Sequence, residues 1–500
     1  MVFGFFLVSG ALAYFTYKRI KEPFLFLLLA VVYSIVIFMP TLAWTYLFDD
    51  IDNFYTITTL HNGFDAVNYI LTPGYGHFIP LIRALYLFCF KYFWLNPAFF
   101  HALIILALIL SGILLSGVLW ELTASKIAAV FGGVLILWST SYLDCMETAF
   151  AHTLFCLPVV LLALYGLCRY VKTNRRRWIV VSAAASFLAP CISAVGVLTG
   201  IWVLLFFTLC LPANTKKDLQ KRPAILFPVL GSWCLSAGIF FVVVNPVHII
   251  LQEGNHQAIF DFPYFVGIGW LVFKSIILYS VPLVTSFEKL SLFIVIFLVL
   301  ILIIKWQQSP KGALLFFFLW LIGNYMFVYY GRGSYGEMIV STQRYHFYPS
   351  LGLAAICAVI MSVILKDRSL ANLKIKTAVS ILLFLLVALY ATAQHNNVLK
   401  ASCGKKDFFA IGLEFRKVVG DYLAKTHQDK VTIKNQEISL EYYDFLRKEF
   451  KQYAAIFLFP SDFDKITWGD RTDNAFIAFI KSNESQYPKI KQILLVNGYL

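Results

Sequence analysis

The chain has 500 residues, of which 60% are hydrophobic and 14% charged, and its formal net charge is +14 at pH 7. The apolar residues form long runs of roughly 20 residues, enough to cross a hydrocarbon layer of ~30 Å, which excludes an ordinary soluble protein. The basic residues flank these runs in short loops, as at 172–177, 216–222 and 366–376. This is the positive-inside pattern of membrane proteins, so the charge does not indicate a nucleic-acid partner.

We predict an all-α polytopic membrane domain over residues 1–397 with about 11–12 transmembrane helices. Each apolar run must be a helix, because lipid offers backbone groups no hydrogen-bond partners. A broken or re-entrant helix fits the pair of spans around Pro190 equally well. The predicted spans are 2–17, 23–47, 98–120, 127–141, 150–171, 178–190, 196–211, 224–245, 290–304, 312–330, 351–366 and 377–393.

Placing the basic loops in the cytoplasm orients the whole chain. The outer loops are then 48–97, 142–149, 246–289 and 331–350, together with everything after about residue 394. Cations interrupt two apolar stretches in these loops, 79–94 and 263–283, and we predict helices that lie in the membrane interface. The predicted location is the plasma membrane, which in a bacterium is the inner membrane.

Residues 398–500 have an ordinary, charged composition. Their apolar periodicity predicts helices near 407–425, 439–454 and 473–486, alternating with short strands at Ile456–Phe459 and Ile493–Val496. We therefore predict a small extracytoplasmic α/β domain.

The sharpest candidate for chemistry is a group of three carboxylates at the outer end of the second span, Asp49, Asp50 and Asp52. Crowded carboxylates raise one another's pKa unless a cation or a substrate compensates, and one of them could then act as a general base. The alternative is a solvated cap at a helix end. Downstream in the same loop, His77 follows a glycine-rich turn and could hydrogen-bond a phosphate or a sugar hydroxyl.

The late outer loop carries Arg332 and Arg344, two of the few exterior arginines, with aromatic neighbours such as Tyr345. Arginine presents a planar fork of donors that suits phosphate, and aromatic rings suit a sugar or an isoprenoid. Either arginine could instead extend to lipid headgroups. Lys274, near the outer interface, is a further candidate partner for an anionic lipid.

The run Asp49-Asp50-Ile51-Asp52, the following His77-Phe78-Ile79-Pro80, the late Gln343-Arg344-Tyr345 and the outer terminal domain together resemble the GT-C superfamily of polyprenyl-phosphate-sugar-dependent glycosyltransferases. The resemblance implies that Asp49 or Asp50 acts as the base or orients the acceptor. It also implies that Arg344, supported by Arg332 and His77, holds the donor phosphate. The chain departs from the best-known members in its extra first span.

The predicted function is transfer of one sugar from a polyprenyl phosphate to a lipid-linked glycan, a lipid or a protein at the outer face, with inversion. A divalent cation such as Mg or Mn would suit the oxygen ligands of the aspartates, although the sequence does not decide whether one binds. The alternatives are a lipid-linked glycan polymerase or ligase, which would use a diphosphate donor, and a flippase or transporter. A transporter usually keeps ionisable residues in the middle of its spans, where this sequence has almost none.

Overall fold

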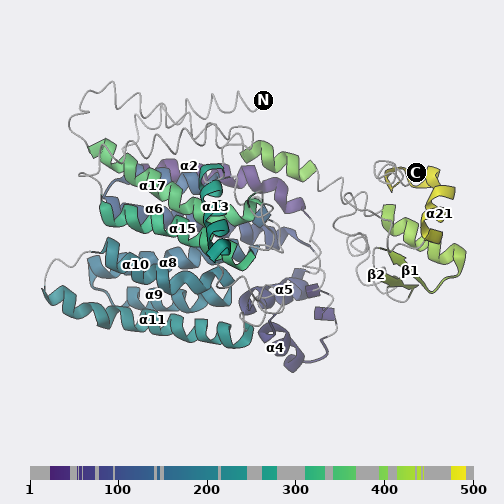
Figure 1. The fold of residues 1–500 in the computed structure, drawn as a ribbon, viewed down its shortest axis with the longest axis horizontal. Coiled ribbons are helices and arrows are strands. Elements are labelled where there is room, and N and C mark those ends of the chain that lie inside the picture. Colours follow the sequence, from purple (N-terminus) through teal and green to yellow (C-terminus); the bar gives the residue numbers. More distant parts are fainter. Residues whose placement is uncertain are drawn as a thin grey trace, which may run out of the picture. The chain divides into compact units, whose positions relative to one another are not determined.

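The computed structural model is mostly helical, and it divides the chain into two compact units (Figure 1). The first unit comprises the described parts of 1–39, 61–85 and 101–398, and the second those of 40–60, 86–100 and 399–500. The side chains of a few described residues, Arg332 and Gln343 among them, are not described. The described residues are 23–44, 53–54, 56–58, 60–73, 78–93, 96–139, 144–146, 151–211, 216–244, 262–278, 310–332, 340, 342–366, 394–403, 414–433, 436–440, 443 and 474–490.

Five helices among the described residues are long and apolar enough to cross a membrane. At about 1.5 Å per residue, twenty helical residues span about 30 Å. Each coincides with a predicted span, so these five predictions are confirmed as long apolar helices. They are α6 (Ala98–Thr123), α8 (Ala151–Thr173), the Pro223–Val244 part of α11 (Lys216–Val244), α15 (Lys311–Arg332) and the Arg344–Leu365 segment, which contains α17 (Phe347–Lys366).

Four further predicted spans correspond to shorter apolar helices: α2 (Pro23–Phe38), α7 (Lys126–Leu137), α9 (Arg177–Leu188) and α10 (Thr199–Cys210). The predicted spans 2–17, 290–304 and 377–393 lie outside the described residues. The structure therefore supports a helical membrane protein, and the total of 11–12 spans stays a prediction.

The chain is broken around Pro190, as one of the two predicted alternatives requires. Helix α9 ends at Leu188, and two 3-10 turns follow, η5 (Ala189–Cys191) and η6 (Ala194–Leu198), before α10 begins. A Cβ at Gly196 would collide with the backbone at Ala189, so only glycine allows the two turns to approach this closely. Helices of twelve residues are about 18 Å long, too short to cross the hydrocarbon layer without the turns.

The helices of the first unit pack side by side (Figure 1). Helix α17 lies between α7 and α15, and α9 lies between α8 and α11. Trp320 of α15 donates from Nε1 to the backbone oxygen of Tyr348 in α17 at 2.8 Å, and its ring lies 5.0 Å from that of Trp202 in α10. Close packing of this kind holds membrane helices together where no hydrophobic force acts between them.

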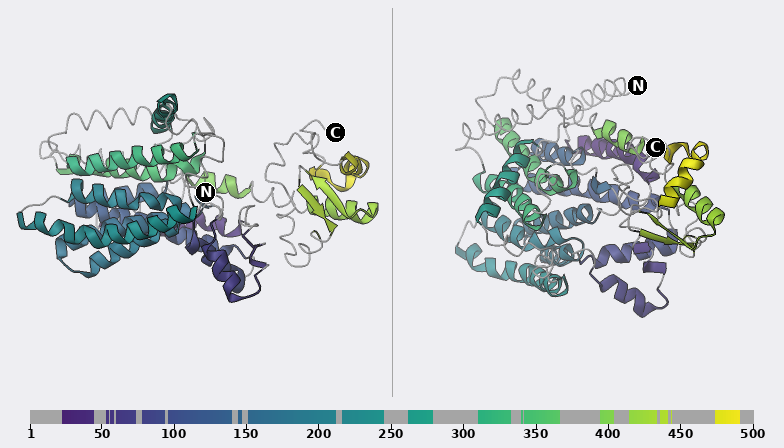
Figure 2. Two further views of the ribbon diagram at one scale, coloured as in Figure 1. Left: turned by 60° about the horizontal axis from the view of Figure 1, so that its bottom comes forward. Right: turned by 45° about the vertical axis from the view of Figure 1, so that its right-hand side comes forward.

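Helix α13 (Phe262–Leu278) crosses the direction of its neighbours steeply (Figures 1 and 2) and packs against α15. Its exposed apolar residues Val266, Trp270 and Phe273 recur at helical spacing, so they form one stripe. This geometry agrees with the predicted interfacial helix at 263–283. The other predicted interfacial stretch, 79–94, contains helix α5 (Pro80–Phe93).

The predicted terminal α/β domain is not supported. Within the described residues, the terminal part contains helices at 394–403 and 414–426, α21 (Asn474–Ser482), η13 (Glu484–Gln486) and one antiparallel hairpin of β1 (Lys430–Ile433) and β2 (Gln436–Ser439). The hairpin was not predicted, although Val431, Thr432 and Ile433 form a β-branched run typical of a strand. The strands predicted at 456–459 and 493–496 lie outside the described residues.

Candidate functional site

The candidate site lies where three elements of the first unit meet: α13, α15 and the 3-10 turn η10 (Gln343–His346) that precedes α17. We call this group the η10 cluster. Tyr345 and Tyr330 are partly buried against its core. Its buried core residues are Ile268, Val272, Leu321, Tyr325, Tyr329 and Val340.

A buried histidine fixes the position of η10. The Nε2 atom of His346 lies 2.8 Å from the backbone oxygen of Val340, and its Nδ1 atom lies 3.0 Å from the Tyr325 hydroxyl. A carbonyl oxygen can only accept, so Nε2 carries the proton, and in the neutral ring Nδ1 accepts from Tyr325. The chain of bonds therefore runs from Tyr325 through His346 to Val340, and it ties α15 to the turn.

A second buried hydrogen bond ties α13 to α15. The hydroxyl groups of Ser275 and Tyr329 are in short contact, and both side chains are buried. Tyr325 and Tyr329 are four residues apart, so they lie on the same face of α15, with ring centroids 5.7 Å apart. Lys274, the residue before Ser275, is partly buried, and its helix α13 is one of the three elements of the η10 cluster.

Arg344 is held against its neighbour. Its guanidinium carbon lies 5.1 Å from the centre of the Tyr345 ring, and its Nη2 atom donates to the Tyr345 hydroxyl at 3.4 Å. Stacking on an aromatic ring already restricts the rotamers of the arginine, so the side chain loses less entropy when it binds a ligand. A partly buried, oriented guanidinium is suited to bind a phosphate through paired hydrogen bonds.

The structure thus places three of the predicted residues, Lys274, Arg344 and Tyr345, on the elements that form the η10 cluster. Arg332 is the last residue of α15, which contributes the tyrosines, but its side chain is not described. Sequence analysis missed His346, Tyr325, Tyr329 and Ser275. The available signal was the spacing of four residues between the two tyrosines near the end of an apolar helix.

A short turn from another predicted outer loop lies beside η10. The 3-10 turn η3 (Asp144–Met146) contacts both η10 and the beginning of α8. Asp144 belongs to a loop that the sequence predicts to be outside, and its backbone lies near the turn that carries Arg344. Helix α8 continues from here for 23 residues, about 35 Å, to a basic end at Lys172. The η10 cluster and the basic end are therefore at opposite ends of a membrane-length helix.

Asp49, Asp50, Asp52 and His77 lie outside the described residues, but the described chain on both sides of the aspartates is anchored within the second unit. Before them, Trp44 donates from Nε1 to the Ser402 hydroxyl at 2.8 Å. After them, Phe54 is fully buried in an aromatic group, with its ring 5.5 Å from that of Tyr86, which lies 5.1 Å from that of Phe100.

Among the described residues, no group of three or more histidine, cysteine, aspartate or glutamate side chains could hold a metal ion. The three aspartates of the first loop are not part of that set. A divalent cation at Asp49, Asp50 and Asp52 therefore stays a prediction.

The fold and its long apolar helices define the chain as a helical membrane protein. The sequence matches no known family model, and a comparison with curated proteins finds no significant similarity.

Proposed function

We propose that the chain is a membrane glycosyltransferase that moves a single sugar from a polyprenyl phosphate to a lipid-linked glycan, a lipid or a protein on the extracytoplasmic face. The observation that carries the proposal is the η10 cluster, where an oriented arginine, a lysine on the adjoining helix α13 and buried tyrosines lie at the end of α8 opposite its basic end. Cations and aromatic rings at one membrane edge suit a ligand with a phosphate and an isoprenoid chain.

The proposed reaction needs few groups. The oxygen of the acceptor hydroxyl attacks the anomeric carbon, and its proton passes to the carboxylate of Asp49 or Asp50. The bond between the anomeric carbon and the phosphate oxygen breaks, and its electron pair leaves with the polyprenyl phosphate. Arg344 stabilises the charge that builds on this phosphate, with Lys274, Arg332 and His77 in support. A single displacement inverts the anomeric centre.

Two alternatives belong to other classes. A lipid-linked glycan polymerase or ligase would use the same cations to hold a diphosphate donor. A flippase or transporter would need ionisable groups within its spans. In α6 and α8 the charged side chains lie close to the helix ends, as Glu121, Arg169 and Lys172 do, which favours an enzyme.

The test is incubation of membranes that contain the protein with labelled polyprenyl-phosphate sugars. We expect transfer by the intact protein and its loss in the Asp49→Asn, Asp50→Asn or Arg344→Ala variants. Lys489→Ala, at an exposed position of the second unit, removes a charge elsewhere, and this variant should transfer the sugar normally. Unchanged transfer in all three site variants would refute the assignment of residues. No transfer from any monophosphate donor, with turnover of a diphosphate donor, would favour the polymerase.

A further inference from the structure

A dense group of cations lies at the other end of α8, where the chain turns into α9. Helix α8 ends at Thr173, and Asn174 adopts a left-handed conformation with φ of 51°, donating to the Tyr170 oxygen at 2.7 Å. This is a usual way to end a helix, because it satisfies a terminal carbonyl. Helix α9 begins three residues later at Arg177. The two helices pack closely, so the turn between them is well defined.

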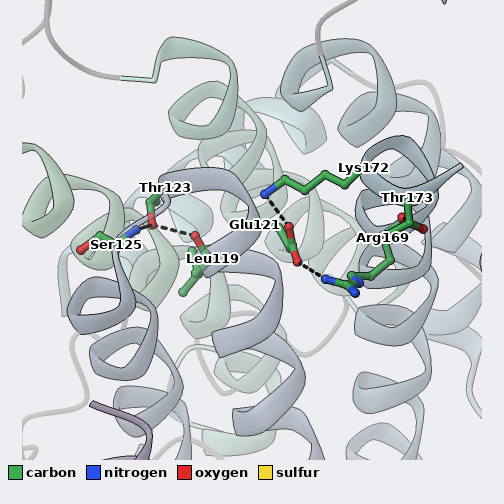
Figure 3. Close-up of polar contacts among 7 residues, drawn as sticks. All are labelled: Leu119, Glu121, Thr123, Ser125, Arg169, Lys172 and Thr173. Carbon is green, nitrogen blue, oxygen red and sulfur yellow. Dashed lines mark hydrogen bonds and ion pairs between the residues drawn. The ribbon is translucent and has the colours of Figure 1, made fainter. Parts of the chain in front are cut away.

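Among the described residues, the charge at this turn is not balanced. Five basic residues lie between 169 and 177, whereas residues 165–182 contain no aspartate or glutamate. Glu121 of α6 reaches into the group from a buried position, with one carboxylate oxygen 3.1 Å from Arg169 Nη1 and the other 2.5 Å from Lys172 Nζ (Figure 3). One carboxylate offsets one of five positive charges. Arg175, Arg176 and Arg177 remain exposed at the turn.

Trp178 organises the cations further. The guanidinium carbons of Arg169 and Arg177 lie 5.7 Å and 5.5 Å from the centre of its ring, and Tyr165 meets it edge to face. The indole Nε1 of Trp178 and the Nε of Arg169 are buried without a hydrogen-bond partner among the described residues. Donors left unpaired in this way are unfavourable, so the group has a surplus of donors as well as of charge.

The position of the arginines adds to the imbalance. A helix N-terminus carries a partial positive charge, so arginines at the beginning of α9 are electrostatically unfavourable unless an anion is present. Arg176, the residue before α9, makes no side-chain capping bond. Two apolar side chains flank the turn, Val171 at 45% and Val180 at 67% exposed. Apolar side chains beside a cationic turn match an acyl chain beneath a phosphate group.

We infer that the α8–α9 turn, residues 174–177 with Arg169, Lys172 and Trp178, binds the phosphate headgroup of an anionic phospholipid in the leaflet at the basic end of the helices. Basic pockets between membrane helices on the cytoplasmic side are suited to such headgroups. In this arrangement Glu121 holds Arg169 and Lys172 in place, and Arg175, Arg176 and Arg177 contact the phosphate. The inference goes beyond the proposed transferase activity and depends only on insertion in a membrane.

The experiment measures binding of a fluorescent short-chain phosphatidylglycerol to the full purified chain in detergent micelles by anisotropy. Each basic residue near an anionic membrane surface strengthens binding by about fivefold. Because the two factors multiply, we expect the double variant Arg176→Gln/Arg177→Gln to bind the lipid about thirtyfold more weakly. The charge-retaining pair Arg176→Lys/Arg177→Lys should keep most of the affinity, which separates loss of charge from loss of folding.

A matched control removes the same charge from another part of the chain. Lys481→Gln/Lys489→Gln, at exposed positions of the second unit, should bind within about twofold of the intact protein, because neither lysine belongs to the α8–α9 turn or to the helices beside it. An equal loss in this control would overturn the inference, since binding would then follow net charge. Displacement of the lipid by inorganic phosphate at the same concentration, or by phosphatidylcholine, would also overturn it, because the site would then not select an anionic lipid.

Discussion

The buried hydrogen bond between Tyr325 and His346 should contribute measurably to the free energy of unfolding of the protein. Tyr325→Phe removes the hydroxyl that lies 3.0 Å from His346 Nδ1 and leaves this acceptor, on a side chain only 2% exposed, without that donor. A buried polar atom that loses its partner lowers the free energy of unfolding by about 1–3 kcal/mol. The phenyl ring keeps the packing of α15, so we expect a loss within this range.

The assay is denaturant-induced unfolding of the purified protein in mixed micelles, with Tyr92→Phe as the control. Tyr92 is 64% exposed, so removal of its hydroxyl should change the free energy of unfolding by less than about 0.5 kcal/mol. In a double-mutant cycle with His346→Leu, the coupling between the two positions should be about 1 kcal/mol or more. A Tyr325→Phe variant as stable as Tyr92→Phe, or a cycle without coupling, would refute the reasoning.

Three further predictions concern packing, pH and the proposed donor site. Gly133→Ala should lower the free energy of unfolding by about 1–3 kcal/mol, because its Cβ would lie 2.5 Å from a backbone oxygen of α6. The control Gly231→Ala, whose Cβ would have nothing within 4 Å, should not lower it. Equal melting temperatures of the two variants would contradict the close approach of Gly133 to α6. Burial raises the pKa of Tyr487, and so does the Asp421 carboxylate that accepts a hydrogen bond from its hydroxyl at 2.6 Å. The neutral Tyr487 side chain therefore stabilises the folded state fully below about pH 10, and this stabilisation is lost as the pH rises further. Tyr487→Phe should therefore be less stable than the intact protein at pH 8, and the difference should shrink by pH 11; a constant difference in melting temperature would count against this. Arg344→Lys should keep part of the transfer rate that Arg344→Ala loses, because lysine keeps the charge but not the planar fork. Transfer by Arg344→Lys at the rate of the intact protein would argue against a paired phosphate contact.

The long apolar helices could be predicted from the sequence because their signal is local. The run within Ala98–Thr123 has one charged residue, Glu121, near its end, and only a helix satisfies the backbone of such a run in lipid. The hairpin at Lys430–Ser439 was missed because strands of four residues give little periodicity, and their pairing depends on contacts along the whole hairpin.

The site could be predicted only in part. Arg344 was recognisable because an arginine with aromatic neighbours in an outer loop is uncommon. Its proximity to α13 could not be foreseen, because Lys274 is 70 residues earlier and the contact depends on how α13 packs against α15. Tyr325 and Tyr329 were overlooked since tyrosines near the end of an apolar run are typical of the aromatic belt of a membrane protein.

The proposed topology places Arg344 and the α8–α9 turn on opposite sides of the membrane, and cysteine labelling tests this placement most directly. Single cysteines are introduced as Arg344→Cys or Arg176→Cys in a background whose nine native cysteines are replaced, and the folded state is checked by size-exclusion chromatography. A membrane-impermeant maleimide should label position 344 in cells whose outer face is accessible, and position 176 only after the membrane is permeabilised. Labelling of both positions from the same side, or of position 176 alone from outside, would contradict the account.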